Sequence, residues 1–285
     1  MQVIEYPKKM QELSEQLRRE GKILGLVPTM GALHEGHLSL LRRCRAENDL
    51  SVMSLFVNPA QFDRKDDLAA YPQDWEGDFK KAEAVGVDLV YAPTAGMMYP
   101  EGYQTYVEVE ALTRRWEGAS RPGHFRGVAT VVAKLFTIVK PHQAYFGQKD
   151  YQQALVVQRM VQDLNLDLEV IILPIIREED GLASSSRNWN LSPEERCAAP
   201  VLYKALQAAE ARVRAGEQGA EAILERMREI IEAEPLAEID YIACCHPMRL
   251  EPVERITESV VFLLAVWIGR TRLIDNALVE VPAQA

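Results

Sequence analysis

The sequence predicts an α/β protein, with a doubly wound parallel sheet followed by a smaller α+β domain. In the first part of the chain, short apolar runs alternate with segments of helical periodicity, which is typical of strands joined by crossover helices. After Asn190 the alternation stops, and helical segments precede three strand-like runs. The change falls within Arg177–Asn190, so we expect one domain over residues 1–180 and a second over residues 181–285.

The elements of the first domain follow from the spacing of apolar residues. Met10, Leu13 and Leu17 lie on one face of a helix expected over residues 7–20, which Gly21 ends. The same spacing predicts further helices over residues 37–46, 75–85, 127–139 and 151–164. The apolar runs expected as strands cover residues 22–29, 49–59, 87–93, 144–148 and 168–176. Ligands of parallel sheets bind at the carboxyl ends of the strands, so polar residues just after these runs are the first site candidates.

The second domain is expected to begin with a helix over residues 192–216, with Ser192 as N-cap and Pro193 in its first turn. A second helix is expected over residues 220–233. Strands are expected over residues 239–245, 259–269 and 271–281. The apolar run within the middle strand is about half of the ~20 residues that a membrane helix needs, so we predict a buried strand and no membrane partner.

Composition narrows the class of protein. The chain has 285 residues and a net charge of −10, which disfavours a nucleic acid partner and favours small-molecule ligands. Its four cysteines form no C-x-x-C pair, and no secretory signal is recognised at the N-terminus, so we expect free thiols in the cytoplasm. The cysteines are Cys44, Cys197, Cys244 and Cys245.

The segment "VPTMGALHEGHLSLL" carries two of the five histidines, His34 and His37. If a helix begins near Glu35, both imidazoles lie at its N-terminus, where free amides and the helix dipole favour anions. Gly31 and Gly36 would let phosphate groups approach the backbone. Phosphate binding is one interpretation; surface histidines near a helix start, or a metal site needing further ligands, are the alternatives.

Two other segments fit a nucleotide. "FGQKDYQQ" places Gly147, Lys149 and Asp150 after a strand, where the ammonium can neutralise phosphate and the carboxylate can accept from ribose. "DGLASSSRN" offers hydroxyls and the Arg187 guanidinium, which forms bidentate bonds to phosphate. Taken alone, the first segment also fits an ordinary surface pair and the second an ordinary turn.

Neutral amides suit a small polar acid. "FVNPAQF" places Asn58 and Gln61 beside apolar residues, and Gln153 adds a third amide; turn chemistry around Asn-Pro is the alternative. "GASRPGHFRGVATVVAKLF" adds positive charge at Arg121, His124 and Arg126, either as a lid that excludes water or as a surface connection.

In this order the segments resemble the pantoate–β-alanine ligase (pantothenate synthetase) family over nearly the whole chain. The resemblance is carried by "PTMGALHEGH", "FVNPAQF", "RPGHFRGVATVV", "FGQKDYQQ", "SSRN" and "TRLIDN". The H-x-G-H element alone is shared by the wider nucleotidyltransferase superfamily. The full series is specific to the family.

The resemblance implies ATP-dependent condensation of pantoate with β-alanine through a pantoyl-adenylate, with release of AMP and pyrophosphate. It implies Mg²⁺ with ligands still unknown, a homodimer, an ATP- and pantoate-binding Rossmann-like domain and a C-terminal lid domain. A metal position of the family falls near Asp78. Another nucleotidyltransferase, or a non-catalytic ATP-binding regulator, would be the rival functions.

The resemblance also implies site residues. His37, as proton donor, His34 and Lys149 would be catalytic, and Gln61, Gln153 and Asn58 would bind substrate, with Gln61 also near β-alanine. Ser184 stands where the family often has an apolar residue. The ATP-binding residues would be Met30, Gly31, His34, His37, Gly147, Gln148, Lys149, Asp150, Ile176, Ser184, Ser185, Ser186 and Arg187.

Overall fold

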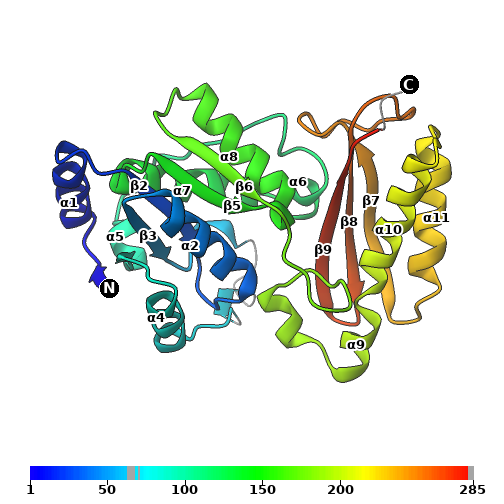
Figure 1. The fold of residues 1–285 in the computed structure, drawn as a ribbon, viewed down its shortest axis with the longest axis horizontal. Helices are drawn as coiled ribbons and strands as arrows, with labels where there is room; N and C mark the ends of the chain where they lie inside the picture. The colour runs from blue at the N-terminus through cyan, green and yellow to red at the C-terminus, as the bar shows by residue number, and fades with distance from the viewer. Residues whose placement is uncertain (63–67, 70, 282–285) are drawn as a thin grey trace. The chain divides into compact units, whose positions relative to one another are not determined.

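The computed structural model describes residues 1–62, 68–69 and 71–281, and the chain divides into two compact units (Figure 1). The first unit comprises residues 1–148 and 152–174, and the second comprises residues 149–151 and 175–285. The units therefore change at residue 174, ahead of the division at residue 180 expected from the sequence. The expected functional roles of the two domains stay predictions.

The first unit is built on a parallel sheet of six strands in the order β1-β4-β3-β2-β5-β6. The strands are β1 (Gln2–Ile4), β2 (Leu24–Thr29), β3 (Leu50–Leu55), β4 (Leu89–Tyr91), β5 (Gln143–Gly147) and β6 (Glu169–Leu173). The chain winds outward from β2 through β3 to β4, then crosses back to β5 and β6. The switch point lies between β2 and β5, where doubly wound sheets bind ligands beyond the carboxyl ends of their strands.

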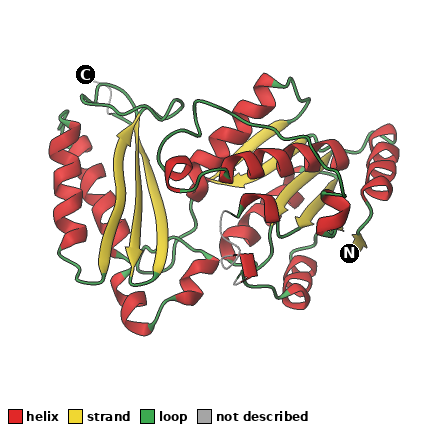
Figure 2. Ribbon diagram, turned by 180° about the vertical axis from the view of Figure 1, so that it is seen from behind, coloured by secondary structure: helices red, strands yellow, loops and turns green. Residues whose placement is uncertain are grey.

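Helices lie over both faces of this sheet, as the opposite views of Figures 1 and 2 show. They are α1 (Pro7–Arg19), α2 (Glu35–Glu47), α4 (Trp75–Ala84), α5 (Ala95–Met98), α6 (Glu117–Ser120), α7 (His124–Val139) and α8 (Tyr151–Asp163), with 3₁₀ turns η1 (Pro59–Gln61) and η2 (Gln148–Asp150). Helix α2 packs on β2, β3 and β5, and α7 packs on β2, α1 and η1. The α/β class and the long helices expected here are confirmed, whereas β1, α5 and α6 were not foreseen.

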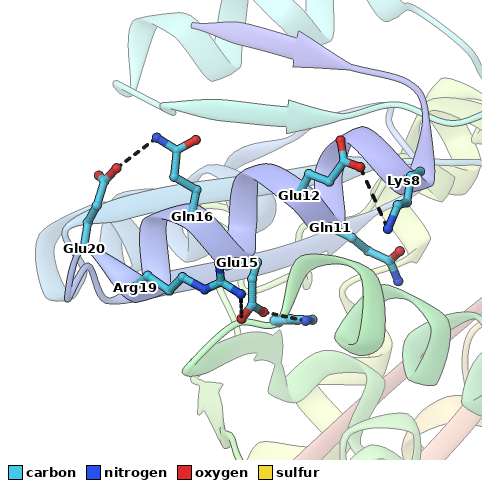
Figure 3. Close-up of a pocket in the computed structure, with 8 residues that line it drawn as sticks. Lys8, Gln11, Glu12, Glu15, Gln16, Arg19 and Glu20 are labelled. Atoms are coloured by element: carbon cyan, nitrogen blue, oxygen red, sulfur yellow. Dashed lines mark hydrogen bonds and ion pairs between the residues drawn. The ribbon is translucent and has the colours of Figure 1, made fainter.

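A depression beside α1 and the end of α7 is lined mostly by charged side chains (Figure 3). Glu15 pairs with Lys140 at 2.7 Å and with Arg19 at 3.4 Å, and Lys8 pairs with Glu12 at 3.8 Å. Opposite charges thus neutralise one another within the depression. Such a surface offers little to a charged ligand.

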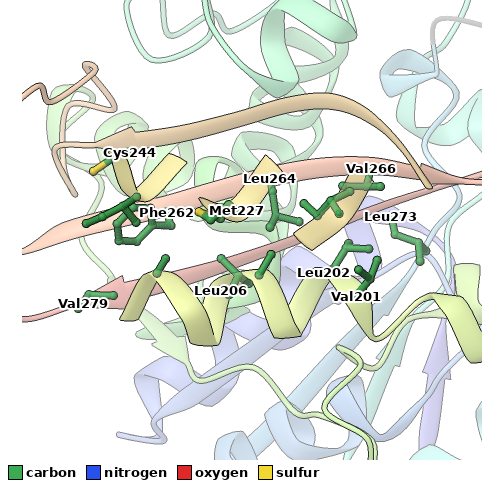
Figure 4. Close-up of a cluster of buried hydrophobic side chains, with 14 of the residues drawn as sticks. Val201, Leu202, Leu206, Met227, Cys244, Phe262, Leu264, Val266, Leu273 and Val279 are labelled. Carbon is green, nitrogen blue, oxygen red and sulfur yellow. The ribbon is translucent and has the colours of Figure 1, made fainter. Parts of the chain in front are cut away.

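The second unit packs helices on one face of an antiparallel sheet of three strands in the order β7-β8-β9. The strands are β7 (Ala237–Cys245), β8 (Val260–Ile268) and β9 (Thr271–Val279), and the helical elements are η3 (Ser186–Asn190), α9 (Pro193–Ala198), α10 (Val201–Arg214) and α11 (Ala220–Glu232). Leu206 of α10 and Met227 of α11 pack toward Phe262 and Leu264 of β8 (Figure 4). β8 is buried at every position except Trp267, as expected for a core strand.

None of the described helices is long and apolar enough to cross a membrane.

The prediction of a single helix over residues 192–216 is wrong, because two helices meet there at Pro200. Proline has no amide hydrogen to donate to the preceding turn, so the helical hydrogen bonds are interrupted there. The expected helix start is confirmed. Ser192 and Glu195 form a reciprocal capping box, with the Ser192 amide 2.8 Å from Glu195 Oε2 and the Glu195 amide 3.2 Å from Ser192 Oγ.

All four cysteines are free, as expected. Cys44, Cys244 and Cys245 are buried, whereas Cys197 is exposed. Burial raises the pKa of Cys44 and of Cys244 to about 12, so both thiols stay protonated at neutral pH.

Candidate functional site

His34 and His37 cap the first turn of α2. His34 has extended backbone geometry at the N-cap, and its Nδ1 accepts the Gly36 amide at 3.2 Å. The His34 amide in turn lies 3.5 Å from His37 Nδ1, and the ring centroids are 4.2 Å apart. A ring nitrogen that accepts carries no proton, so this geometry places the proton of each neutral imidazole on Nε2. Two N–H donors therefore join the amides of a helix N-terminus, which is an arrangement suited to phosphate.

The loop between β2 and α2 is shaped by residues outside it. Gly31 and Ala32 both have positive φ, at +88° and +53°. The carboxylate of Asp78 accepts the amides of Ala32 and Leu33. Met30, expected to line ATP, lies with its Sδ 3.2 Å from Gln61 Nε2. The loop thus joins the histidine cap to the amide-bearing segment after β3.

Asn58 is buried at 1% exposure, and its side chain is fully used within the protein. Its Nδ2 donates to Gln61 Oε1 at 3.0 Å and to the Gly127 carbonyl at 3.1 Å. Its Oδ1 accepts from the Ala60 amide at 3.3 Å and from the Tyr99 hydroxyl at 2.7 Å. Asn58 thereby orients Gln61, and a direct contact of Asn58 with substrate stays a prediction.

Gln61 is fixed at both its side chain and its backbone. Because Oε1 accepts from Asn58, the amide presents Nε2 as its donor. The Gln61 carbonyl lies 2.8 Å from His124 Nδ1, and His124 Nε2 lies 3.3 Å from Arg121 Nη1. The segment around His124, for which a lid was one interpretation, thus packs on η1. Sequence analysis missed His124, Tyr99 and Gly127 as supports of Gln61.

The third amide candidate, Gln153, lies half-buried in the first turn of α8. Among the described residues its side-chain amide has no hydrogen-bond partner, and its contact with a ligand stays a prediction. Its neighbour Gln152 is buried instead, and bonds the backbone of Leu112, Arg115 and Glu117. Two adjacent glutamines therefore differ in role, which the sequence alone does not distinguish.

In the second unit, Lys149, Ser185 and Arg187 line one small cavity together with Asn188 and Asp275. Lys149 Nζ lies 3.8 Å from Asp150 Oδ1 in η2, directly after Gly147 and Gln148. Ser185 caps η3, where its hydroxyl accepts the Arg187 amide at 3.2 Å. The expected ammonium and guanidinium thus line the same small cavity, and their binding of phosphate stays a prediction.

The loop that carries these serines is anchored by a buried ion pair. Arg177 forms two bonds to Asp275, at 2.7 and 3.0 Å. Burial raises the pKa of Asp275, and Arg177 opposes that shift by favouring the carboxylate. Ser184, despite its unusual identity, donates its amide to the Ile176 carbonyl at 2.9 Å. Two residues of the "TRLIDN" segment hold neighbouring loops. Asp275 binds Arg177, and Asn276 donates to the Lys149 carbonyl at 3.0 Å.

Within residues 1–62, 68–69 and 71–281, no three His, Cys, Asp or Glu side chains are grouped to hold a metal ion. Within these residues, His34 and His37 therefore have no third side chain beside them that could complete a metal site. Both oxygens of Asp78 already accept backbone amides.

The H-x-G-H segment starts a helix just beyond the switch point of a doubly wound sheet, which agrees with the resemblance to the H-x-G-H nucleotidyltransferases. A family model described as pantoate-beta-alanine ligase matches residues 2–278, and the chain belongs to that family. Its activity is the condensation of pantoate with β-alanine using ATP.

Close relatives and solved structures agree over nearly the full length. The pantothenate synthetase of Thermodesulfovibrio yellowstonii is 52% identical over 281 residues, which cover 98% of this chain and 100% of the relative. That of Moorella thermoacetica is 55% identical over 264 residues, or 93% of each chain. The enzyme from Thermus thermophilus superposes with a TM-score of 0.92 at 48% identity, covering 97% of this chain and 99% of that one. The Francisella tularensis ligase, solved with β-γ ATP and β-alanine, gives a TM-score of 0.81 at 33% identity, covering 98% and 97%.

Proposed function

We propose that the chain activates pantoate as a pantoyl-adenylate and then transfers the pantoyl group to β-alanine. A carboxylate reacts poorly with an amine, because its leaving group is poor, and adenylation replaces that group with AMP. The observation that carries this proposal is the pair of imidazoles at the start of α2, each with its Nδ1 turned toward a backbone amide. They can stabilise negative charge that grows on phosphate oxygens.

In the first step, a pantoate carboxylate oxygen attacks the α-phosphorus of ATP, and the bond to pyrophosphate breaks. Charge rises on the phosphate oxygens and on the leaving pyrophosphate, so donors aimed at those atoms lower the barrier. We assign this role to His34, His37, Lys149 and Arg187, with His37 as the proton donor. The remaining expected contacts of ATP, from Met30 and Gly31 to Ser186, stay part of this proposal.

In the second step, the β-alanine amine attacks the acyl carbon, the bond to AMP breaks, and the amine loses a proton. Gln61 and Gln153 hold pantoate, Gln61 through Nε2 because its Oε1 is occupied by Asn58. Positioning supplies much of the acceleration in such a reaction. No covalent enzyme intermediate is needed, which agrees with the protonated thiols of Cys44 and Cys244.

Mg²⁺ fits as a companion of ATP. Proteins commonly bind Mg²⁺ through substrate phosphates and water, with one or two carboxylates. Asp150 is half-exposed and lies 3.8 Å from Lys149 Nζ, so its carboxylate could face such an ion. When bound, the ion would neutralise part of the phosphate charge.

The decisive assay follows AMP and pyrophosphate with ATP, pantoate and β-alanine each omitted in turn. AMP release should require both pantoate and β-alanine. A different nucleotidyltransferase would keep releasing pyrophosphate over many turnovers without β-alanine, whereas the proposed enzyme would stop once each chain holds one pantoyl-adenylate. A non-catalytic ATP-binding regulator would bind ATP without releasing pyrophosphate. Either result would refute the proposed function.

Two substitutions test the assigned residues. His37→Ala and Lys149→Ala should each lower kcat by about 10²–10³-fold, since one strong transition-state contact contributes ~3–4 kcal/mol. Far-UV circular dichroism should be unchanged. His246→Ala, in a loop of the second unit, and Lys204→Ala, on the exposed side of α10, are matched controls that should keep full activity. A fully active Lys149→Ala variant would remove that residue from the mechanism.

We also propose that the protein acts in the cytoplasm as a homodimer, as the family resemblance implies. Light scattering after size-exclusion chromatography tests the assembly, because the chain has a mass of 32.2 kDa and a dimer would have twice that value. A mass of one chain across micromolar concentrations would contradict the dimer.

A further inference from the structure

Asp78, in the first turn of α4, is fully buried at 0% exposure. Each of its carboxylate oxygens accepts a different amide of the loop that leads to His34. Oδ2 accepts from Ala32 at 2.9 Å, and Oδ1 accepts from Leu33 at 2.7 Å. Short bonds between amides and an ionised carboxylate are stronger than bonds between neutral groups.

The loop needs such a partner because its backbone is unfavourable. Ala32 has φ of +53°, a left-handed conformation that non-glycine residues seldom adopt. Gly31 has φ of +88°, and a Cβ there would lie 2.8 Å from Asp78 Oδ2. The loop therefore lies directly against the carboxylate, and glycine is the residue that permits this approach.

Lys81, one turn further along α4, completes the attachment. Its Nζ donates to the Leu33 carbonyl at 2.8 Å. Leu33 is thus held at its amide by Asp78 and at its carbonyl by Lys81, while its side chain is buried in the core at 1% exposure. The next residue is His34, the N-cap of α2.

We propose that Asp78 and Lys81 are positioning residues that set the direction of the His34 and His37 Nε2 donors. They act through the backbone of Ala32 and Leu33. The inference rests on the proposed function for its kinetic consequence, although the orientation of the imidazoles can be tested separately. It assigns Asp78 to the loop amides in place of a metal ion.

Asp78→Asn is the sharpest test, because asparagine has the same shape but only one accepting oxygen. Its NH₂ group would face a backbone amide, so one loop bond is lost and the loop shifts. A displacement of this kind is expected to lower kcat about 10²-fold. Half-saturating Mg²⁺ should be unchanged, and NMR of the ring nitrogens should show altered signals for His34 and His37.

Matched controls separate loop positioning from general weakening of α4. Asp74→Ala removes the N-cap of the same helix, where Asp74 Oδ1 accepts the Gly77 amide at 3.0 Å, without touching the loop. Lys81→Met should lower kcat about tenfold, since one of the loop bonds is lost. Its control is Lys80→Met, because Lys80 pairs with Glu76 on the exposed side. Both controls should keep the wild-type kcat and ring-nitrogen spectra.

Three results would overturn the inference. The first is an Asp78→Asn variant with kcat and imidazole spectra equal to those of Asp74→Ala. The second is a shifted Mg²⁺ dependence with unchanged imidazole spectra, which would make Asp78 a metal ligand. The third result applies if Asp78→Asn does not fold. In that case, a Lys81→Met variant with the same kcat and imidazole spectra as Lys80→Met would contradict the positioning role. If the wild type forms no AMP, the proposed function fails, while the imidazole spectra still test the positioning.

Discussion

Replacing Gly127 by alanine adds one methyl group where α7 crosses η1. A Cβ at this position would lie 2.2 Å from the Ala60 carbonyl oxygen, 2.4 Å from the carbonyl carbon and 2.6 Å from Gln61 Cα. All three are backbone atoms, so no side chain can rotate away. The two segments must separate by about 1 Å to restore ordinary contact, and dense protein interiors resist such a shift.

Opposing effects set the size of the change. Alanine favours the helix over glycine by about 0.5–1 kcal/mol. Overpacking costs about 1–3 kcal/mol. Loss of the Asn58 bond to the Gly127 carbonyl, 3.1 Å in length, removes roughly 0.5–1.5 kcal/mol more. We expect a net loss of about 1–3 kcal/mol, and a fall in melting temperature of roughly 2–12 °C.

The same shift should move Gln61, whose amide donor is proposed to bind pantoate. A misplacement of about 1 Å can cost up to 10²-fold in catalytic efficiency, so we expect KM for pantoate to rise about tenfold or more. KM for ATP should change little. Thermal unfolding by circular dichroism and steady-state AMP release measure the two effects.

Gly96→Ala in α5 is the matched control, because a Cβ there would meet nothing within 4 Å. It should unfold at or slightly above the wild-type temperature and keep the wild-type KM. A Gly127→Ala variant with unchanged melting temperature and unchanged KM for pantoate would refute the packing argument.

Two further predictions concern partly buried polar side chains. Tyr99→Phe removes the hydroxyl that donates to Asn58 at 2.7 Å, and should lower the free energy of unfolding in urea by about 1 kcal/mol; no loss would mean that the bond does not stabilise the fold. Burial and the charge of Arg18 lower the pKa of His142 below 6.5, and its Nδ1 accepts the Leu24 amide at 3.0 Å. The unfolded chain therefore binds a proton at His142 more strongly than the folded protein does. The neutral imidazole thus contributes to folding stability above about pH 6.5, and this contribution is lost as pH falls through the lower pKa of the folded protein. His142→Gln should show a smaller fall in melting temperature than the wild type between about pH 7 and 5, and equal slopes would contradict this assignment.

Periodicity predicted the long helices and the described strands other than β1, because apolar spacing reports directly which face of an element is buried. It also placed His34, Asn58 and Lys149 after strand ends. It did not reveal the break at Pro200, since strong helical spacing on both sides masked a local backbone constraint. The only sign of this break in the sequence is one proline, and the apolar spacing on either side of it is that of a continuous helix.

The supports of the site were beyond sequence reasoning for a different reason. Asn58 bonds a carbonyl 69 residues away, and Asp78 bonds amides 45 and 46 residues away. A polar residue after a strand is equally compatible with binding a ligand or with holding a neighbour that does. Only tertiary structure distinguishes the two, because the distinction depends on which hydrogen-bonding atoms are already used.

One physical pattern recurs in each unit. In the first, Asp78 holds the loop before His34 and Asn58 holds Gln61; in the second, Asn276 holds the backbone of Lys149. A side chain whose neighbours are fixed loses little conformational entropy when a ligand binds. Donors fixed in advance also need no reorganisation when charge develops on phosphate. Substitution of a buried support should therefore change kinetics while leaving the ligand-binding side chains themselves intact, which is the behaviour that Asp78→Asn and Gly127→Ala are designed to test.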